Sequence, residues 1–254
     1  FEEFLAFEDM DTSGFSKVNY FGYEDDILLE PARTWLTDRG DDPFLITYMT
    51  GTSHHNYGLP TGFESVQLDN DPHKNAYLNS IRYTDLFLGK VIALHKELGL
   101  YENTLFVVLG DHGEAFGEHG RYQHDGVPYQ EVVHIPMLFH APGAFVGGQH
   151  IDALVSQLNV MPTIADLLGY TVVSLDRPAN SLLALSSPKP VLVSCYYADT
   201  CSAIMDGPWK FIHHHGQRTD ELFRIDIDPQ ERDNLANEYP KRAADMRATV
   251  LQWI

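Results

Sequence analysis

An aspartate and two histidines in one short stretch offer the first chemistry in this sequence. Asp111 and His112 are adjacent, lie between two glycines and follow the apolar run at residues 104–109, and His124 lies twelve residues after His112. Carboxylate and imidazole are ligands of divalent first-row cations, and imidazole also transfers protons near neutral pH. An isolated Asp-His pair is more often a polar turn, so a metal site here requires further ligands to converge on the pair.

His54 and His55 provide a second group of imidazoles, in the loop after the apolar run at residues 43–49. Residues 43–49 and 104–109 are short, apolar and rich in aromatic and branched side chains, which predicts two buried strands. Ligands of open α/β sheets bind at the carboxyl ends of the strands. We therefore expect one of the two histidines to meet the ligands of the 110–124 stretch in a common crevice.

The elements that must position these loops alternate between helices and strands. Helical spacing of apolar residues and helix-end signals predict helices at 24–38, 71–99 and 160–168, and a further apolar run predicts a strand at 136–140. This alternation is typical of α/β domains. We predict a doubly wound mixed sheet flanked by helices.

The last part of the chain has a different pattern. Short strand-like runs at 191–197, 209–213 and 221–226 precede a helix at about 239–254, which predicts a small C-terminal antiparallel subdomain with a terminal helix. We place the α/β domain at residues 1–185 and the subdomain at 186–254. The three histidines at 213–215 are interpreted as a solvated hairpin in preference to a metal site.

Composition excludes several classes of function. The chain has 254 residues and a formal net charge of −19. An acidic surface repels nucleic acid, so no polynucleotide partner is expected. The apolar run at 105–109 is far shorter than the roughly 20 residues that cross a bilayer, and no membrane span is expected. Cys195 and Cys201 are equally compatible with a disulfide bond and with two free thiols.

Longer blocks around these residues resemble the alkaline-phosphatase superfamily, in the branch that contains sulfatases, lipoteichoic-acid synthases and phosphoethanolamine transferases. The similar blocks extend over essentially the whole chain and include GDHGEAFGEHG at 110–120, PYQE at 128–131, HIPML at 134–138, QLNVMPTI at 157–164, GPWKFI at 207–212 and ELFRIDIDPQERDNLA at 221–236. The loop TSHHNYGLP at 52–60 is more similar to the lipoteichoic-acid synthases. The resemblance implies that the chain is the C-terminal part of a catalytic domain.

The resemblance also implies roles for individual residues. Asp111 and His112 are expected to bind the metal that holds a covalent nucleophile, and His54 and His124 to bind a second metal or to hydrogen-bond the ester oxyanion. His54 and His124 are therefore candidates for catalysis and for both metal and substrate binding, whereas Asp111 and His112 are candidates for metal binding. Apart from the resemblance, an anionic ester that approaches a protein with a net charge of −19 needs local positive charge, which Lys210 or Arg121 is expected to add. Many sulfatases have asparagine at the place of His112 and lysine at the place of His124, so imidazole ligation here favours Mn²⁺ or Zn²⁺, with Ca²⁺ as the alternative.

These roles predict a metal-dependent sulfatase-family hydrolase that cleaves sulfate or phosphate monoesters of small molecules or glycans through a covalent intermediate. The nucleophile has no candidate in this chain and is expected in a missing N-terminal half of the same protein. One alternative is a phosphoethanolamine or phosphoglycerol transferase, and another is a non-catalytic binding remnant. The expected location is extracytoplasmic: secreted, lumenal or anchored to a membrane through the missing part.

Overall fold

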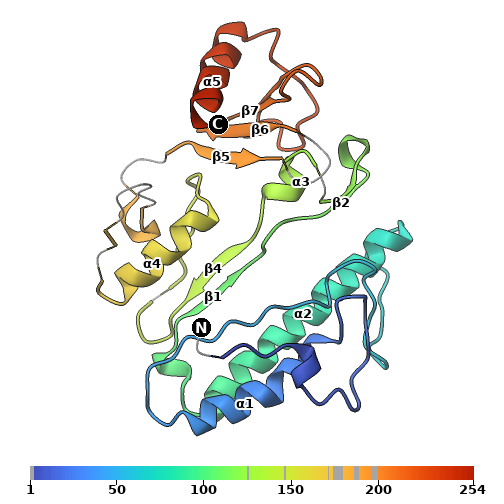
Figure 1. Cartoon of the computed structure of the whole chain (residues 1–254), viewed down its shortest axis with the longest axis vertical. Helices are drawn as coiled ribbons and strands as arrows, with labels where there is room; N and C mark the ends of the chain where they lie inside the picture. Colours follow the sequence, from blue (N-terminus) through green and yellow to red (C-terminus); the bar gives the residue numbers. More distant parts are fainter. Residues whose placement is uncertain are drawn as a thin grey trace. The chain divides into compact units, whose positions relative to one another are not determined.

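The computed structural model describes residues 3–124, 126–145, 147–170, 172–173, 180–185, 189–195 and 200–254. The chain forms two compact units, one made of Phe1–Val107 with Phe139–Val146, and the other of Val108–Leu138 with Gly147–Ile254. Strand β1 (Phe106–Leu109) pairs with β4 (Met137–His140) (Figure 1). The division between the units falls within both strands, after Val107 and after Leu138. Both strands were expected from the apolar runs.

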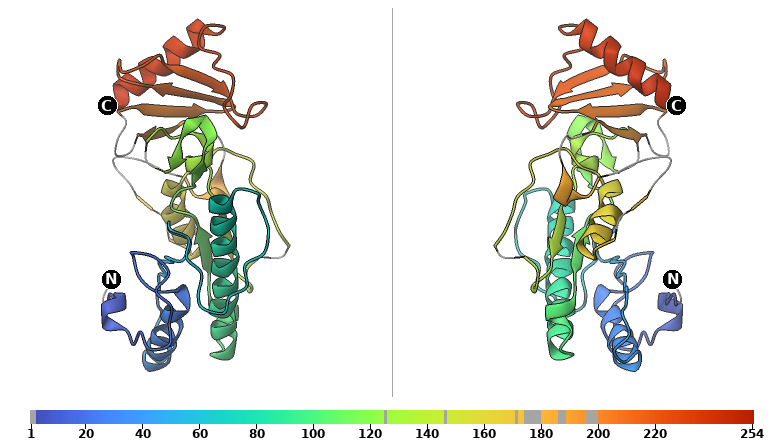
Figure 2. Two further views of the ribbon diagram at one scale, coloured as in Figure 1. Left: turned by 90° about the vertical axis from the view of Figure 1, so that its right-hand side faces the viewer. Right: turned by 90° about the vertical axis from the view of Figure 1, so that its left-hand side faces the viewer.

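Two helices dominate the first unit. Helix α1 (Leu29–Asp38) follows the short 3-10 helix η2 (Asp25–Leu28), and α2 (Pro72–Glu97) lies beside α1, as the views in Figures 1 and 2 agree. The carboxylate of Asp71 caps α2 by accepting hydrogen bonds from the main-chain nitrogens of the second and third helical residues, at 2.8 and 3.1 Å. The remaining 3-10 helices of this unit are η1 (Phe7–Asp9) and η3 (Tyr101–Asn103).

The expected strand at 43–49 is wrong. The segment is extended, but among the described residues it belongs to no β-ladder. Its side chains alternate: Phe44, Ile46 and Tyr48 pack against the α1–α2 core, whereas Leu45 and Met49 are 67% and 80% exposed. An apolar pattern reports which side chains are buried, but a strand also needs a neighbouring backbone for hydrogen bonding.

The second unit begins with short elements around the histidine-rich stretch. Strands β2 (Ala115–Phe116) and β3 (Tyr122–Gln123) form an antiparallel pair, with η4 (Glu118–Gly120) between them. Helix α4 (Val160–Leu167) matches the expected helix at 160–168. The other helical turns of the unit are α3 (Gln130–Val133), η5 (Gln157–Asn159) and η6 (Leu182–Ala184).

The C-terminal part is an antiparallel sheet with a terminal helix, as expected. Its strands are β5 (Val191–Ser194), β6 (Ser202–Asp206), β7 (Trp209–His213) and β8 (Glu221–Arg224), paired in that order, and helix α5 (Pro240–Trp253) follows (Figure 2). Strand β6 was missed by the sequence patterns. Residues 196 and 197 of the expected first strand lie outside the described residues, as do residues 186–188 beside the expected domain boundary, which stays a prediction.

Both faces of this sheet are covered. Side chains at Ile204, Phe211 and Leu222 face α5 and pack with Met246 and Val250. The alternate side chains point to the opposite face and pack with the loop that precedes α3, in a cluster of Val127, Tyr129, Cys201, Ala203, Ile212 and Phe223. The C-terminal sheet therefore packs against the loop that links β3 to α3 and holds that loop in place.

The structure decides the state of the two cysteines and the environment of the three consecutive histidines. Cys195 and Cys201 form a disulfide bond with a Cα–Cα separation of 4.9 Å, next to the β5–β6 pairing. The interpretation of residues 213–215 as a solvated hairpin is wrong for His213 and His214, which are 4% and 2% exposed. Their rings lie 2.8 Å from Asp220 and 2.7 Å from Glu221, and these carboxylates make burial tolerable.

Candidate active site

The Asp111–His112 pair sits at the end of β1 on a firmly held backbone. The side-chain amide of Gln157 donates to the carbonyls of Gly110 and Asp111, at 3.1 and 2.9 Å. On the other side, the Gly113 nitrogen donates to the Val132 carbonyl at 2.7 Å. The close approach at Gly113 leaves no room for a side chain, because a Cβ there would lie 2.1 Å from a main-chain oxygen. The local geometry thus explains the glycine after the pair.

The structure brings Asp111, His112 and His124 together. The rings of His112 and His124 stack with centroids 3.9 Å apart, and His112 Nε2 lies 3.5 Å from Asp111 Oδ2. His124 Nδ1 lies 3.4 Å from Glu114 Oε2. Glu114 was not a candidate from sequence. Its side chain is only 6% exposed, and within the described residues its Oε1 is buried without a hydrogen-bond partner.

These donors fit part of a metal site. His112 Nδ1–H donates to the Gly113 carbonyl at 2.9 Å, so the neutral ring carries its lone pair on Nε2, facing the Asp111 carboxylate. Two lone-pair atoms facing each other are stabilised by a shared cation, and a main-chain partner on the other ring nitrogen is usual for a metal-bound histidine. However, no group of three or more His, Cys, Asp or Glu side chains that could hold a metal ion occurs in the described part of the chain. Asp111 and His112 therefore supply two ligands for a metal ion.

His54 lies in the first unit, in a loop anchored by two buried polar residues. Asp25 Oδ1 accepts hydrogen bonds from the nitrogens of Gly51 and Thr52, at 2.6 and 3.0 Å, and Asn19 Nδ2 donates to the Gly51 carbonyl at 2.7 Å. Burial raises the pKa of Asp25, although these hydrogen bonds oppose the shift. Sequence analysis missed both anchors, because an aspartate before a helix is normally interpreted as a cap.

The orientation of the His54 ring is also defined. Its Nδ1–H donates to the His55 carbonyl at 3.0 Å, which leaves Nε2 as the lone-pair nitrogen of the neutral ring. His55 Nε2 is 3.0 Å from the hydroxyl of Tyr20. The ligands of the 110–124 stretch belong to the second unit. The expected convergence of His54 with them stays a prediction.

Lys210 does not lie where a substrate could contact it. Its side chain is completely buried, and Nζ lies 2.8 Å from Oε1 of Glu231, whose side chain is also completely buried. Burial lowers the pKa of Lys210 and raises that of Glu231, and the attraction between the two groups opposes both shifts. The expected substrate contact is corrected to a structural ion pair. A lysine is usually exposed, so the sequence suggested an exposed charge at Lys210. Its partner Glu231 lies in a separate loop, and the sequence pattern does not reveal that pairing.

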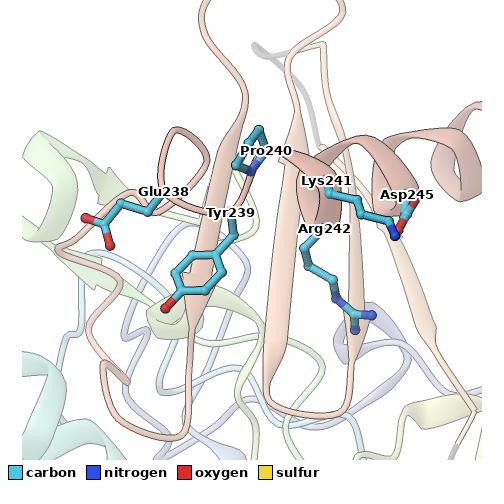
Figure 3. Close-up of a pocket in the computed structure, with 6 residues that line it drawn as sticks. All are labelled: Glu238, Tyr239, Pro240, Lys241, Arg242 and Asp245. Atoms are coloured by element: carbon cyan, nitrogen blue, oxygen red, sulfur yellow. The ribbon is translucent and has the colours of Figure 1, made fainter.

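A shallow pocket lies at the start of α5 (Figure 3). It is lined by Glu238, Tyr239, Pro240, Lys241, Arg242 and Asp245. None of the candidate residues from the sequence belongs to it. Arg242 is already paired with Asp206 at 2.7 Å. The pocket is therefore not part of the candidate active site.

Comparison with known proteins identifies the family. The family model described as Sulfatase matches residues 1–170. The chain therefore belongs to the sulfatase family, within the alkaline-phosphatase superfamily that the sequence blocks resemble. None of the described helices is both long and apolar enough to cross a membrane.

Individual relatives agree with this assignment. Arylsulfatase K of Rattus norvegicus is 31% identical over 177 residues, covering 62% of this chain and 31% of the relative. Choline-sulfatase of Rhizobium meliloti is 28% identical over 235 residues, covering 88% of this chain and 43% of the relative. The chain thus spans about a third to two fifths of the length of these relatives. The crystal structure of Ps i-CgsB in complex with k-i-k-neocarrahexaose has a TM-score of 0.69 at 20% identity, covering 91% of this chain and 55% of that one, and supports the shared α/β fold.

Proposed function

We propose that the protein hydrolyses sulfate monoesters with the help of a divalent cation. The single observation that carries this proposal is the cluster of Asp111, His112 and His124 at the end of β1, in a chain that belongs to the sulfatase family. The family match favours a hydrolase over a phosphoethanolamine or phosphoglycerol transferase. Phosphate monoesters are the alternative substrates.

The proposed roles follow from the chemistry of each donor. The Asp111 carboxylate and His112 Nε2 would hold the cation, while Gly113 and Gln157 fix the backbone that carries them. When bound, the cation neutralises charge on the ester oxygens and lowers the pKa of a nucleophile that it contacts. Imidazole ligation favours Mn²⁺ or Zn²⁺ over Ca²⁺. A covalent nucleophile would come from outside these residues.

The remaining imidazoles would act on the ester. His124 is stacked on His112 and oriented by Glu114, so it can present a ring nitrogen to an ester oxygen beside the cation. His54 is proposed to bind an ester oxygen through its own Nε2. A positioned imidazole that protonates the leaving oxygen accelerates such reactions by roughly 10²- to 10⁴-fold.

The proposal is tested by measuring metal content and ester hydrolysis of the whole protein. We expect Asp111→Asn and His112→Ala to lose bound metal and to lower kcat/KM for p-nitrophenyl sulfate by about 10²-fold or more. His150→Ala is the matched control, since its side chain is 87% exposed and lies 2.8 Å from the exposed Asp152. Full metal content and full activity in both variants would refute the site assignment.

Further parts of the proposal concern the ester and the compartment. Comparing p-nitrophenyl sulfate with p-nitrophenyl phosphate decides which ester is preferred, and absence of turnover of both by the whole protein supports a binding role. We also propose that the natural substrate is a sulfate ester of a small molecule or glycan met outside the cytoplasm. The Cys195–Cys201 disulfide supports an oxidising compartment.

A further inference from the structure

A tight turn next to His54 presents two aromatic side chains to solvent. The turn closes where the Val18 nitrogen donates to the Gly22 carbonyl at 3.0 Å, and Tyr20 and Phe21 lie at its tip. Tyr20 is 59% exposed and Phe21 is 53% exposed. Two adjacent exposed aromatic rings on an ordered turn offer a flat apolar surface on which a ring-shaped ligand can stack.

The backbone of this tip is rigidly held. Asn19 is 8% exposed, and its Oδ1 accepts hydrogen bonds from the nitrogens of Phe21 and Gly22, at 2.9 and 3.3 Å. Its Nδ2 donates to the Gly51 carbonyl at 2.7 Å, which joins the tip to the loop that carries His54. A fixed backbone under exposed rings reduces the entropy lost when a ligand binds to them.

The rings of the tip are in contact with the histidines. Tyr20 and Phe21 lie with centroids 4.7 Å apart at 30°, and the His54 ring is nearly perpendicular to both, at 5.2 Å from Tyr20 and 4.3 Å from Phe21. The Tyr20 hydroxyl is bound to His55, which fixes the tilt of its ring. The result is one continuous aromatic surface that borders the candidate ester-binding histidine. Neither tip residue carries a charge, so the surface suits the uncharged part of a ligand.

We propose that the aromatic tip, defined as Tyr20 and Phe21, binds the ring of the organic group that carries the sulfate ester. The shared chemistry is a ring with a flat apolar face, whether a sugar ring or an aryl ring, that stacks on the tip while its sulfate lies at His54. This inference rests on the proposed function for the role of His54. It assigns a specificity-determining role to residues that the ester chemistry does not use.

The test compares sulfate esters with and without a ring. Steady-state kinetics of the whole protein are measured with glucosamine 6-sulfate, p-nitrophenyl sulfate and n-propyl sulfate. For the variant Tyr20→Ala/Phe21→Ala we expect kcat/KM to fall by about 10-fold or more for a ring-bearing ester, mainly through KM, because stacking on an aromatic side chain contributes substantially to binding. The value for n-propyl sulfate should stay unchanged. Which ring-bearing ester loses more identifies the sugar or the aryl ring as the preferred ligand.

Two controls separate ring binding from folding. Phe21→Tyr keeps an aromatic ring and should retain the wild-type preference, and Phe4→Ala removes an aromatic side chain that is 79% exposed and should change nothing. Thermal unfolding of each variant checks that the fold is intact. An equal loss for all three esters, or no loss for any, would overturn the proposal.

Failure of the proposed function gives a different result. If the wild-type protein hydrolyses none of the esters, binding of the two ring-bearing esters is measured directly by saturation-transfer NMR. Transfer to the ring protons that is lost in Tyr20→Ala/Phe21→Ala and kept in Phe4→Ala supports the aromatic tip as a binding surface without catalysis. Equal transfer in all variants, or none in the wild type, refutes it.

Discussion

The buried ion pair between Lys210 and Glu231 allows a sharp test of how the second unit is stabilised. Both side chains are completely buried, with Nζ and Oε1 2.8 Å apart, and Glu231 Oε2 also accepts a hydrogen bond from the Gln130 nitrogen at 2.6 Å. Lys210→Met removes the cation but keeps most of the side-chain volume. The Glu231 carboxylate is then left buried without its counter-charge.

The expected cost follows from this burial. Removing one partner of a buried ion pair destabilises a protein by about 3–5 kcal/mol. For a chain of this size each kcal/mol shifts Tm by about 2–4 °C, so Lys210→Met should lower Tm by about 6–20 °C. Adding Glu231→Gln neutralises the orphaned carboxylate and keeps an oxygen for the Gln130 nitrogen. The double variant should therefore regain most of the loss.

Thermal unfolding followed by circular dichroism measures these shifts. Lys90→Met is the matched control, because Lys90 pairs with Asp26 while its own side chain is 49% exposed. Exposed pairs contribute at most about 1 kcal/mol, so the control should shift Tm by less than about 4 °C. Equal shifts for Lys210→Met and Lys90→Met, or a double variant no more stable than Lys210→Met, would refute the reasoning.

Three further predictions concern the two units separately. Burial disfavours the charged form of His119, but its hydrogen bonds to Glu131 and to a main-chain carbonyl outweigh burial and raise its pKa above 6.5. The charge-dependent part of the stabilisation that His119→Gln removes should therefore be complete below about pH 6.5 and be lost as the pH rises through the raised pKa. A difference in urea unfolding that stays constant from pH 5.5 to 9 would contradict this. Asp25→Ala removes the acceptor that holds the His54 loop and should lower kcat/KM by up to about 10²-fold, whereas Asp25→Asn keeps an acceptor oxygen and should stay much closer to wild type; equal losses in the two variants would exclude a positioning role. Gly113→Ala places a Cβ 2.1 Å from the Glu131 carbonyl oxygen and should lower Tm, while Gly148→Ala meets nothing within 4 Å and should not, so equal thermal unfolding of the two variants would disprove the close contact.

The parts of the fold that sequence could predict are those determined by local signals. Helix α2 has its aspartate cap and first-turn proline, and strands β7 and β8 have short apolar patterns, so their positions followed from the chain itself. The segment 43–49 shows the limit of that approach. Its inward face is apolar as predicted, but whether it joins a sheet depends on a partner backbone that no local pattern reports.

The candidate site was predictable to the same extent. The proximity of Asp111 and His112 follows from adjacency. That of His124 was expected because the polar stretch follows the carboxyl end of a strand, and it is found as ring stacking. The supporting residues Glu114 and Asp25 were missed, because their roles depend on burial and on partners in other segments. Lys210 was misassigned for the same reason.

The loop between β3 and α3, which packs on the C-terminal sheet, links segments that are far apart in the sequence of the second unit. Tyr129 donates its hydroxyl to the carboxylate of Glu221 on β8, and the next residue, Gln130, binds Glu231 in the loop after β8. The stretch that carries His124 thus rests on contacts supplied about a hundred positions later in the chain. Clipping the polypeptide after β7 would therefore disable the proposed chemistry without removing any residue that performs it.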